Sequence, residues 1–380
     1  MRLLDWLRGI DYAKYTVLLA YTTDVFSSRV KSLGLPVVCT PLTVPVEGRF
    51  WKVFFSWLSY LRQIRADKII MGDGYFGEWP LATVLAAYLV APGKVYLTEH
   101  TPYPQAPRKA SKIHLGFLPG LGLWWYKLVW PLRVRAYLAR RVLAVSRQLK
   151  EWLVHFYGYP SGKIVVAYRG IDTSRFRRAS NEARVSLRAS FNIPAHSTVI
   201  VSTARLSSPK RIDWLIKAFE ALSASRESLW LLLVGDGPLR KELESQAGAC
   251  SARERIRFTG FLEDVSAPLQ ASDIFVLASA FEGFGTAILE AMASELVCVV
   301  TDTVGPGEVI ENSENGFLVQ PSDEGVLEGL EKALKLSPAE RELMGEKARQ
   351  TIQERFQFSD TIKKALAMLE IDQIEQDIRA

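Results

Sequence analysis

Short runs rich in Val, Ile and Leu alternate with helix-length amphipathic segments along the whole chain of 380 residues. Strands that are separated by helices form βαβ units, and the strands of such units pair in parallel. The runs of the second half are almost continuously apolar, which is typical of strands buried on both faces. The alternation therefore predicts an α/β protein with a parallel sheet in each half.

The expected strands cover residues 16–21, 36–41, 68–74, 94–100, 141–146 and 163–168 in the first half, and 197–204, 229–235, 256–260, 274–279, 297–302 and 316–319 in the second. Apolar residues at the helical period predict helices at 51–64, 78–89 and 212–222.

The length of the chain suits two domains of about 150 to 200 residues each. We place an N-terminal domain at 1–170, a C-terminal domain at 171–355, and a final helix in 356–380 that crosses back to the first domain. Ligands of such sheets bind at the carboxyl ends of the strands. We therefore expect a ligand in a cleft that the carboxyl ends of both sheets face.

Composition excludes several classes of protein. With 48% hydrophobic and 23% charged residues the chain is a folded protein and not a disordered one. Residues 1–170 hold 23 Lys and Arg against 9 Asp and Glu, whereas the remainder holds 24 against 32. No nucleic-acid-binding module accompanies this charge, so nucleic acid is not expected as a partner.

The expected location is cytoplasmic. The first residues show no secretion signal. The three cysteines, Cys39, Cys250 and Cys298, lack paired spacing, so reduced core residues are the main expectation and a metal or disulfide role the alternative.

Residues 113–132 are as apolar as a membrane span but contain two prolines, three glycines, a His and a Lys. Tryptophans and basic residues lie together over 108–141. We interpret this segment as one that lies on an anionic membrane surface. The alternatives are an element that packs inside the protein and a true span.

The strongest candidate for chemistry follows the expected strand at 274–279. A glycine-rich turn, AFEGFG, leads into a helix that begins near Thr286, and such a helix start attracts phosphate. Glu282 lies in the turn and Glu290 about one turn into the helix. Carboxylates beside a diphosphate are expected to accept hydrogen bonds from sugar hydroxyls. The residues alone leave equally open that Glu282 is solvated and that Glu290 only complements its helix.

Two cations belong to the same half of the chain. Arg205 follows the expected strand at 197–204, and Lys210 precedes the next helix. Two such cations neutralise a diphosphate without a metal, so no metal and no cofactor are expected. The alternative is a solvated loop that carries two surface cations.

The segments TARLSSPKRIDWLIKAFEAL, LLLVGDGPLRKELE, FTGFLEDV and ASDIFVLASAFEGFGTAILEAMA resemble glycosyltransferase family 4 in order and spacing. AVSRQLKEWL and KIVVAYRGIDTSRF resemble family segments less closely. The resemblance implies the GT-B fold, in which two Rossmann-like domains face a central cleft. It also implies retaining transfer of a sugar from a nucleotide-sugar donor.

The resemblance also implies roles for individual residues. Glu282 and His100 would act at the transferred sugar and are the expected catalytic residues, while Glu290 would contact the ribose. The other expected donor-binding residues are a pair of cations on the diphosphate, the backbone that meets the base, and backbone amides that meet the sugar or phosphate: Arg205 and Lys210, Phe261, and Phe284, Gly285 and Thr286.

Three features depart from the family pattern. The opening strand and glycine-rich loop of the N-terminal domain are not recognisable in this sequence, because LLDWLRGI already resembles the helix that follows them. Tyr168-Arg169 stands in place of a usual Pro-Asn, and VGPGE replaces a double glycine. Arg169 adds a cation, either for an acidic acceptor or donor or for a salt bridge at the domain boundary.

The function that these patterns predict is sugar transfer to a hydroxyl of a glycan or polyprenyl-linked acceptor, in surface polysaccharide or glycolipid biosynthesis. The expected location is the inner face of the cell membrane, as a peripheral protein. The alternatives are a non-catalytic or partner-dependent GT-B subunit and a nucleotide-sugar epimerase of the same architecture.

Overall fold

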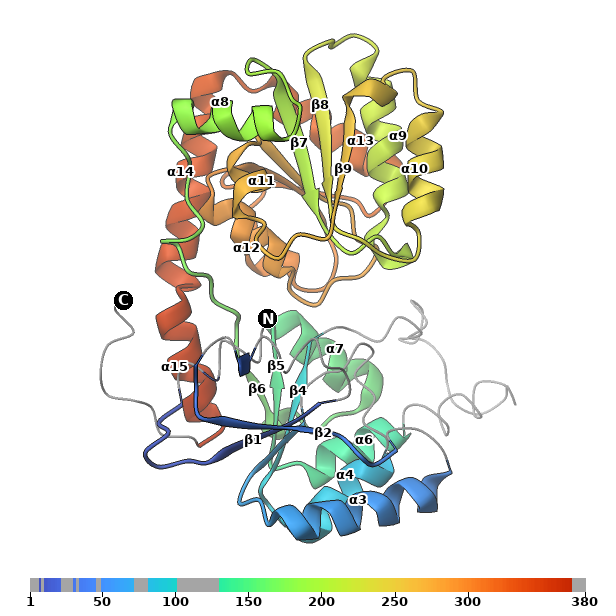
Figure 1. The fold of residues 1–380 in the computed structure, drawn as a ribbon, viewed down its shortest axis with the longest axis vertical. Helices are drawn as coiled ribbons and strands as arrows, with labels where there is room; N and C mark the ends of the chain where they lie inside the picture. Colours follow the sequence, from blue (N-terminus) through green and yellow to red (C-terminus); the bar gives the residue numbers. More distant parts are fainter. Residues whose placement is uncertain are drawn as a thin grey trace. The chain divides into compact units, whose positions relative to one another are not determined.

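The computed structural model describes residues 7, 10–21, 30, 31, 34–45, 49–71, 81–100 and 130–370. The chain divides into two compact units, residues 1–168 with 359–380 and residues 169–358. Each unit contains parallel strands accompanied by helices (Figure 1). The α/β class that the sequence predicts is therefore confirmed.

The first unit alternates strands and helices. Its strands are β1 (Val17–Tyr21), β2 (Val37–Pro41), β3 (Ile69–Met71), β4 (Val95–Glu99), β5 (Arg141–Ala144) and β6 (Ile164–Val166). Its helices are α3 (Phe50–Ile64), α4 (Leu81–Val90), α6 (Trp130–Leu138), α7 (Arg147–Tyr157) and α15 (Phe358–Met368).

The strands of the first unit form two parallel sheets within the described residues, and the expectation of one sheet is wrong there. β3, β4, β5 and β6 pair in that order, and β1 pairs with β2 alone. Leu18 of β1 and Val38 of β2 are exposed, whereas the side chains of β4 are buried. Alternation along the sequence predicts which segments are strands, but the pairing of strands depends on contacts between distant segments.

Helix α15 belongs to the first unit although it follows the whole second unit in the chain. Ala365 and Leu369 are buried in a cluster with Tyr96 of β4 and Leu143 of β5. Just after α15, the Glu370 carboxylate accepts hydrogen bonds from the Arg140 guanidinium at 3.0 Å and the Tyr96 hydroxyl at 3.1 Å. Both apolar burial and polar contacts thus attach α15 to the four-stranded sheet.

The second unit contains a six-stranded sheet. Its strands are β7 (Thr198–Thr203), β8 (Leu229–Val234), β9 (Ile256–Gly260), β10 (Ile274–Leu277), β11 (Val297–Thr301) and β12 (Phe317–Val319). Its helices are α8 (Asn181–Ser190), α9 (Ile212–Ser223), α10 (Arg240–Gly248), α11 (Ser266–Gln270), α12 (Thr286–Ala293), α13 (Asp323–Lys335) and α14 (Pro338–Arg355).

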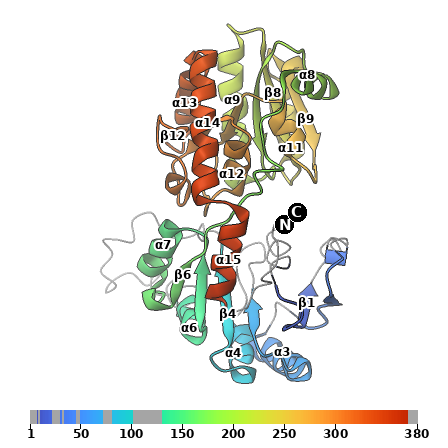
Figure 2. The same ribbon diagram turned by 90° about the vertical axis from the view of Figure 1, so that its left-hand side faces the viewer.

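The strand order of this sheet is β12-β11-β10-β7-β8-β9, with every neighbouring pair parallel. Read from the other edge, the order is 3-2-1-4-5-6, the doubly wound arrangement of Rossmann domains. Helix α9 packs beside α13, and α12 packs beside α14 (Figure 2). The chain reverses its winding direction between β7 and β10, so the loops that follow these two strands are where a ligand is expected.

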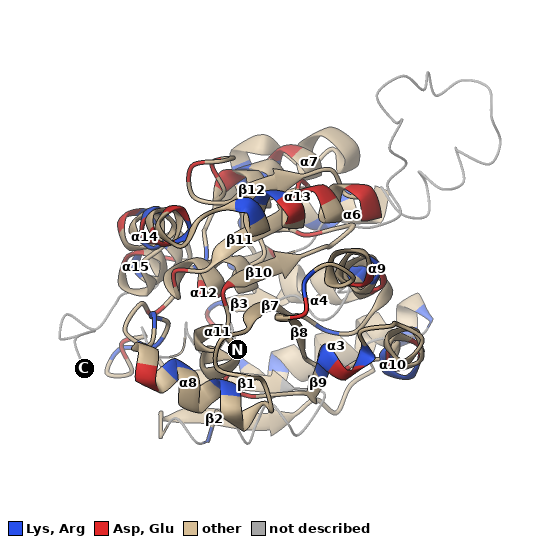
Figure 3. Cartoon of the chain, turned by 90° about the horizontal axis from the view of Figure 1, so that it is seen from above, with Lys and Arg blue, Asp and Glu red and all other residues tan. Residues whose placement is uncertain are grey.

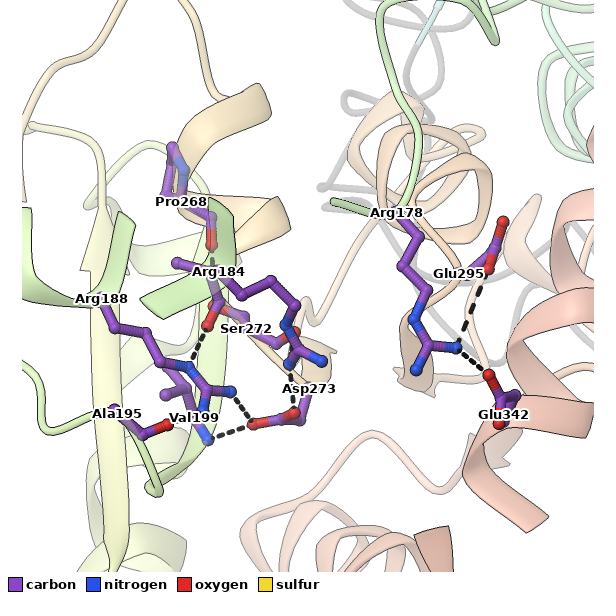
Figure 4. Close-up of polar contacts among 11 residues, drawn as sticks. Arg178, Arg184, Arg188, Ala195, Val199, Pro268, Ser272, Asp273, Glu295 and Glu342 are labelled. Atoms are coloured by element: carbon purple, nitrogen blue, oxygen red, sulfur yellow. Dashed lines mark hydrogen bonds and ion pairs between the residues drawn. The ribbon is translucent and has the colours of Figure 1, made fainter. Parts of the chain in front are cut away.

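A cluster of ion pairs fixes α8 to the amino-terminal edge of this sheet (Figure 4). Asp273, just before β10, pairs with Arg184 and with Arg188, whose guanidinium lies 2.8 Å from the carboxylate. The same carboxylate accepts the backbone N–H of Val199 at 2.8 Å. Figure 4 also shows Arg178 beside Glu342 and Glu295. These contacts leave the opposite, carboxyl edge of the sheet to the loops described below.

Two segments at the limits of the second unit run side by side. Ile171 forms a parallel bridge with Gln357. The Ile171 N–H donates to the Phe356 carbonyl at 2.9 Å, and the Phe358 N–H donates to the Ile171 carbonyl at 3.2 Å. The chain thus enters and leaves the unit at one hydrogen-bonded pair of segments.

Some expectations lie outside the described residues. The residues that the structure does not describe include most of the segment at 113–132, residues 371–380 and most of LLDWLRGI. Among the helices in the described ranges, none has both the length and the apolar character that crossing a bilayer requires.

Candidate donor-binding site

The loop between β10 and α12 has a left-handed backbone conformation at its last position, which favours glycine. Gly285 precedes α12 with a φ of +80°, and a Cβ there would lie 2.6 Å from Cδ1 of Ile288. The first turn of α12 carries no acidic residue. The positive end of the helix dipole is therefore not offset by an acid of the helix's own first turn, which suits an anionic ligand.

Lys210 and Glu282 form an ion pair between the two loops at the switch point. The lysine ammonium donates to the carboxylate, and the side chains are 24% and 13% exposed. Close by, the Ala280 N–H donates to the Pro209 carbonyl at 2.8 Å. A side-chain pair and a backbone bond thus join the loops, and the structure brings together two residues that the sequence places 72 positions apart.

Arg169 adds a second cation at the start of α12. Its guanidinium donates a hydrogen bond of 3.0 Å to the Thr286 hydroxyl, on the first residue of the helix. A cation at this end of a helix destabilises the helix by about 0.3–1 kcal/mol, because it lies at the positive end of the helix dipole. The arrangement becomes favourable when an anion binds between the cation and the helix. Both roles left open for Arg169, in anion binding and in a salt bridge at the domain boundary, stay predictions.

Arg205 is exposed on the loop that follows β7, and two glycines hold the backbone on either side of it. A Cβ at Gly235 would lie 2.0 Å from the Ala204 carbonyl oxygen, and one at Gly237 would lie 2.3 Å from that of Leu206. The loop after β8 therefore packs directly on the backbone that carries Arg205. Side chains larger than hydrogen would push the two loops apart.

Asp236 lies between these glycines. The Gly237 N–H donates to its carboxylate at 2.7 Å and Arg240 lies 2.9 Å from it. The backbone hydrogen bond, followed by the bond from Arg240, lowers the pKa of Asp236, so this carboxylate remains charged at neutral pH. It serves the loop and is not expected to meet a diphosphate.

Three of the expected residues have different environments. Glu290 is buried on α12, and the Phe284 side chain is buried against the ring of Phe356, 5.6 Å between centroids. Phe261 follows β9 and is exposed. The Phe284 side chain therefore belongs to the core of the unit, and the contact of its backbone with a ligand stays a prediction.

Gly305 connects the loop after β11 to the candidate site. Its φ is +103°, and a Cβ there would lie 2.2 Å from the Gly283 carbonyl oxygen. The sequence shows VGPGE only as a departure from a double glycine. The structure gives this glycine a function that the sequence did not reveal, since it lets the β11 loop support the glycine-rich turn.

His100 belongs to the first unit, directly after β4. Its Nε2 lies 3.2 Å from the Thr98 hydroxyl. The neighbouring Glu99 is fully buried, where its carboxylate accepts the Tyr159 hydroxyl at 3.0 Å and lies 3.5 Å from the buried Arg135 guanidinium. These three buried residues, for which no sequence motif stands out, anchor the strand end that carries His100.

All three cysteines are unpaired, with Cys250 and Cys298 buried and Cys39 half-buried. Burial raises the pKa of the Cys298 thiol, so it stays protonated. Within the described ranges, no three His, Cys, Asp or Glu side chains gather as a metal-binding group does.

The second unit thus presents one arrangement at its switch point. Arg169 and Lys210 supply positive charge beside the start of α12, Arg205 stands on the adjoining loop, and Glu282 supplies a carboxylate. Cations and helix N–H groups bind phosphates, and carboxylates bind hydroxyls. A ligand with both a diphosphate and a sugar matches this combination.

Several solved structures share this fold, and one of them is named as a glycosyltransferase. The chain superposes on Anabaena Alr3699/HepE in complex with UDP and glucose with a TM-score of 0.77 and 20% identity, over 97% of this chain and 94% of that one. For a glycosyltransferase from Rickettsia africae the TM-score is 0.73 and the identity 19%, over 94% and 90% of the two chains. These likenesses define the fold as GT-B, with two Rossmann-like domains.

Sequence comparison identifies the family. Residues 15–175 match the family described as Glycosyltransferase Family 4, and residues 184–351 match Glycosyl transferases group 1. The chain belongs to glycosyltransferase family 4, and the resemblance drawn from its motifs is confirmed.

Curated relatives share about a quarter to a third of the aligned residues. An uncharacterised glycosyltransferase of Methanocaldococcus jannaschii is 27% identical over 62% of this chain and 61% of its own length. A putative glycosyltransferase EpsD of Bacillus subtilis is 30% identical over 48% of each chain. The UDP-Gal:alpha-D-GlcNAc-diphosphoundecaprenol alpha-1,3-galactosyltransferase of Escherichia coli is 23% identical over 79% of this chain and 74% of its own length. The chain spans about half to three fifths of the length of the first two relatives.

Proposed function

We propose that this protein is a retaining glycosyltransferase that moves a sugar from a nucleoside-diphosphate donor to a hydroxyl of a glycan or lipid-linked acceptor. The observation that carries the proposal is the meeting of Lys210, Glu282, Arg169 and the start of α12 at the switch point of the six-stranded sheet. The cations and the helix start match the charge of a nucleotide sugar, and the Glu282 carboxylate matches its hydroxyls. The switch point is also where such a ligand is expected.

The chemistry follows from where charge develops. The bond between the anomeric carbon and the diphosphate oxygen breaks, and a bond to the acceptor oxygen forms on the same face of the sugar. The acceptor's proton passes to the leaving diphosphate, so the products are a glycoside and a nucleoside diphosphate. Lys210, Arg205 and the α12 backbone stabilise the negative charge on the leaving group, and such preorganised charge lowers the barrier.

The Lys210–Glu282 ion pair fits a site that changes its pairing when it binds the donor. Before binding, each side chain neutralises the other in a half-buried position. A diphosphate takes up the Lys210 ammonium, and Glu282 then accepts hydrogen bonds from sugar hydroxyls. His100 of the first unit and Glu290 keep the roles expected from the family, at the transferred sugar and the ribose.

UDP-sugars are the first donors to test, because Anabaena HepE has been solved with UDP and with UDP-glucose. Acceptors in lipopolysaccharide or lipid-linked glycan synthesis are supported by relatives named for those steps. We propose that catalysis needs no metal, with the cations of the site in its place. We also propose a peripheral position at the inner face of the membrane, in contact with anionic lipid through residues 108–141.

A thermal-shift screen of UDP, GDP and ADP and their sugars identifies the donor, because a ligand that binds only the folded state raises Tm. Hydrolysis of that donor, and transfer to a polyprenyl-linked glycan, are then measured with and without EDTA. Activity that EDTA abolishes refutes the metal-free mechanism. A protein that binds no nucleotide and shows no turnover refutes the proposal and favours the partner-dependent subunit.

A further inference from the structure

Helix α3 has an exposed face on which aromatic rings and cations lie together. The buried face of the helix consists of Val53, Phe54, Trp57 and Leu61. On the outer face, Trp51 and Phe55 are 63% and 59% exposed. Soluble proteins seldom leave neighbouring large aromatic side chains so exposed unless the surface binds a partner.

The spacing puts these rings in one stripe. Trp51, Phe55, Leu58 and Arg62 follow one another at intervals of four, three and four residues, so they lie on one side of the helix. The two rings stack, with centroids 6.0 Å apart. Arg62 extends the stripe with a positive charge. The stripe is thus apolar at the amino-terminal half of α3 and cationic at its carboxyl-terminal half.

A hollow of about 660 Å³ lies along this face. Its walls come from the apolar and cationic parts of the same stripe and from its neighbours: Phe55, Leu58, Ser59, Arg62, Gln63 and Arg65. An amphiphile with an anionic head matches such a surface, because its chain can meet the rings while its phosphate meets the guanidinium groups.

Helix α6 repeats the pattern. Trp130, Arg133 and Tyr137 are exposed at intervals of three and four residues, and the Arg133 guanidinium lies 5.8 Å from the Tyr137 ring. Helix α4 packs against both α3 and α6, so the three helices form one layer of the first unit (Figures 1 and 2). Aromatic and basic residues therefore recur across that layer.

The layer contains no compensating negative charge of its own. Neither α3, α4 nor α6 includes an Asp or Glu, whereas α3 and α6 together contain the exposed cations Lys52, Arg62 and Arg133. By contrast, α13 and α14 of the second unit carry acids and bases side by side (Figure 3). A protein partner would be expected to meet a mixture of charges, but a surface of anionic lipid calls for cations only.

We infer that the outer face of α3 is a membrane-contact surface that binds an anionic bilayer, with Trp51 and Phe55 in the interface and Lys52 and Arg62 at the headgroups. Interfacial helices combine such aromatic residues with a basic face. The inference rests on the proposed membrane location, but it assigns the contact to α3, outside the segment 108–141.

The test is co-sedimentation of the full-length protein with vesicles of phosphatidylglycerol and phosphatidylcholine. Trp51→Ser with Phe55→Ser is expected to weaken binding by about tenfold or more, since two interfacial rings are lost. The matched control is Val185→Ser with Leu343→Ser, exposed apolar residues of the second unit at 49% and 55%. It is expected to bind as the wild type does.

Charge is tested separately. Lys52→Glu with Arg62→Glu is expected to reduce binding to the mixed vesicles, and Lys241→Glu with Arg253→Glu makes the same change in charge on the second unit. Because net charge changes equally in both variants, only a local contact predicts a difference between them. Equal loss in the two variants would overturn the inference, as would equal binding to vesicles of phosphatidylcholine alone.

Insertion of Trp51 is tested by fluorescence quenching with brominated lipids, which is expected to be weaker in Trp51→Phe than in the wild type. Sedimentation velocity tests whether a second copy of the chain covers this face instead of lipid. A dimer that dissociates in the variant Trp51→Ser with Phe55→Ser would overturn the lipid assignment. Donor hydrolysis is followed in every variant. Lost vesicle binding with retained hydrolysis supports the inference, while absent hydrolysis in the wild type concerns the proposed transferase activity alone.

Discussion

Gly305→Ala tests whether the loop after β11 positions the glycine-rich turn of the candidate site. The new Cβ would lie 2.2 Å from the Gly283 carbonyl oxygen, and ordinary contact begins at 3.4 Å. The two loops must therefore separate by about 1 Å. A displacement of this size at a reacting group costs about 100-fold in rate, or about 2.7 kcal/mol of transition-state stabilisation.

The same substitution also costs stability, because alanine at a φ of +103° is strained by about 1–3 kcal/mol. The measurements are urea unfolding, the Kd of UDP, and kcat/KM for hydrolysis of the donor that the screen selects. Gly248→Ala is the control, since nothing lies within 4 Å of its added Cβ and its φ is ordinary. If Gly305→Ala keeps kcat/KM within about threefold of the wild type, the loop after β11 does not position the glycine-rich turn for the reaction.

Lys210→Ala and Glu282→Ala are each expected to abolish transfer while circular dichroism stays unchanged, and near-normal turnover in either would refute the site. Arg169→Ala is expected to weaken UDP binding about tenfold without lowering Tm in the absence of ligand, since it removes a cation from a helix start; a lower Tm with unchanged UDP affinity would show a structural role. Asp273→Ala is expected to cost about 3 kcal/mol in urea unfolding because it leaves two arginines uncompensated. The control is the exposed ion pair of Asp264 with Arg175, where Asp264→Ala is expected to lower the free energy of unfolding by under about 1 kcal/mol.

The strands of the second unit could be predicted closely from the sequence. β8, β10 and β11 are almost continuously apolar, and a strand buried on both faces leaves that signature. The start of α12 could also be predicted at Thr286, because the glycine-rich turn precedes it. Local chemistry decides both features, so a single sequence suffices for them.

Features that depend on distant residues could not be predicted. Arg169 lies beside the expected boundary, and its hydrogen bond to the Thr286 hydroxyl joins residues 117 positions apart. The periodicity of α3 predicts a helix but not that Trp51 and Phe55 remain uncovered, because burial depends on which helices pack beside it. The separation of β1 and β2 from the four-stranded sheet likewise depends on pairing between segments that the sequence does not order.

The position of α15 has a consequence for biosynthesis. The ribosome makes the strands of the first unit early, yet Ala365 and Leu369, which fill part of the core against Tyr96 and Leu143, emerge only after the entire second unit. Domains generally fold during synthesis in the order in which they appear. Here the later domain has all of its own residues before the earlier one does, so the second unit can reach its native state first. The core of the first unit stays incomplete until residues 359–370 have been synthesised. We therefore expect the first unit to be exposed to chaperones for longer than the second.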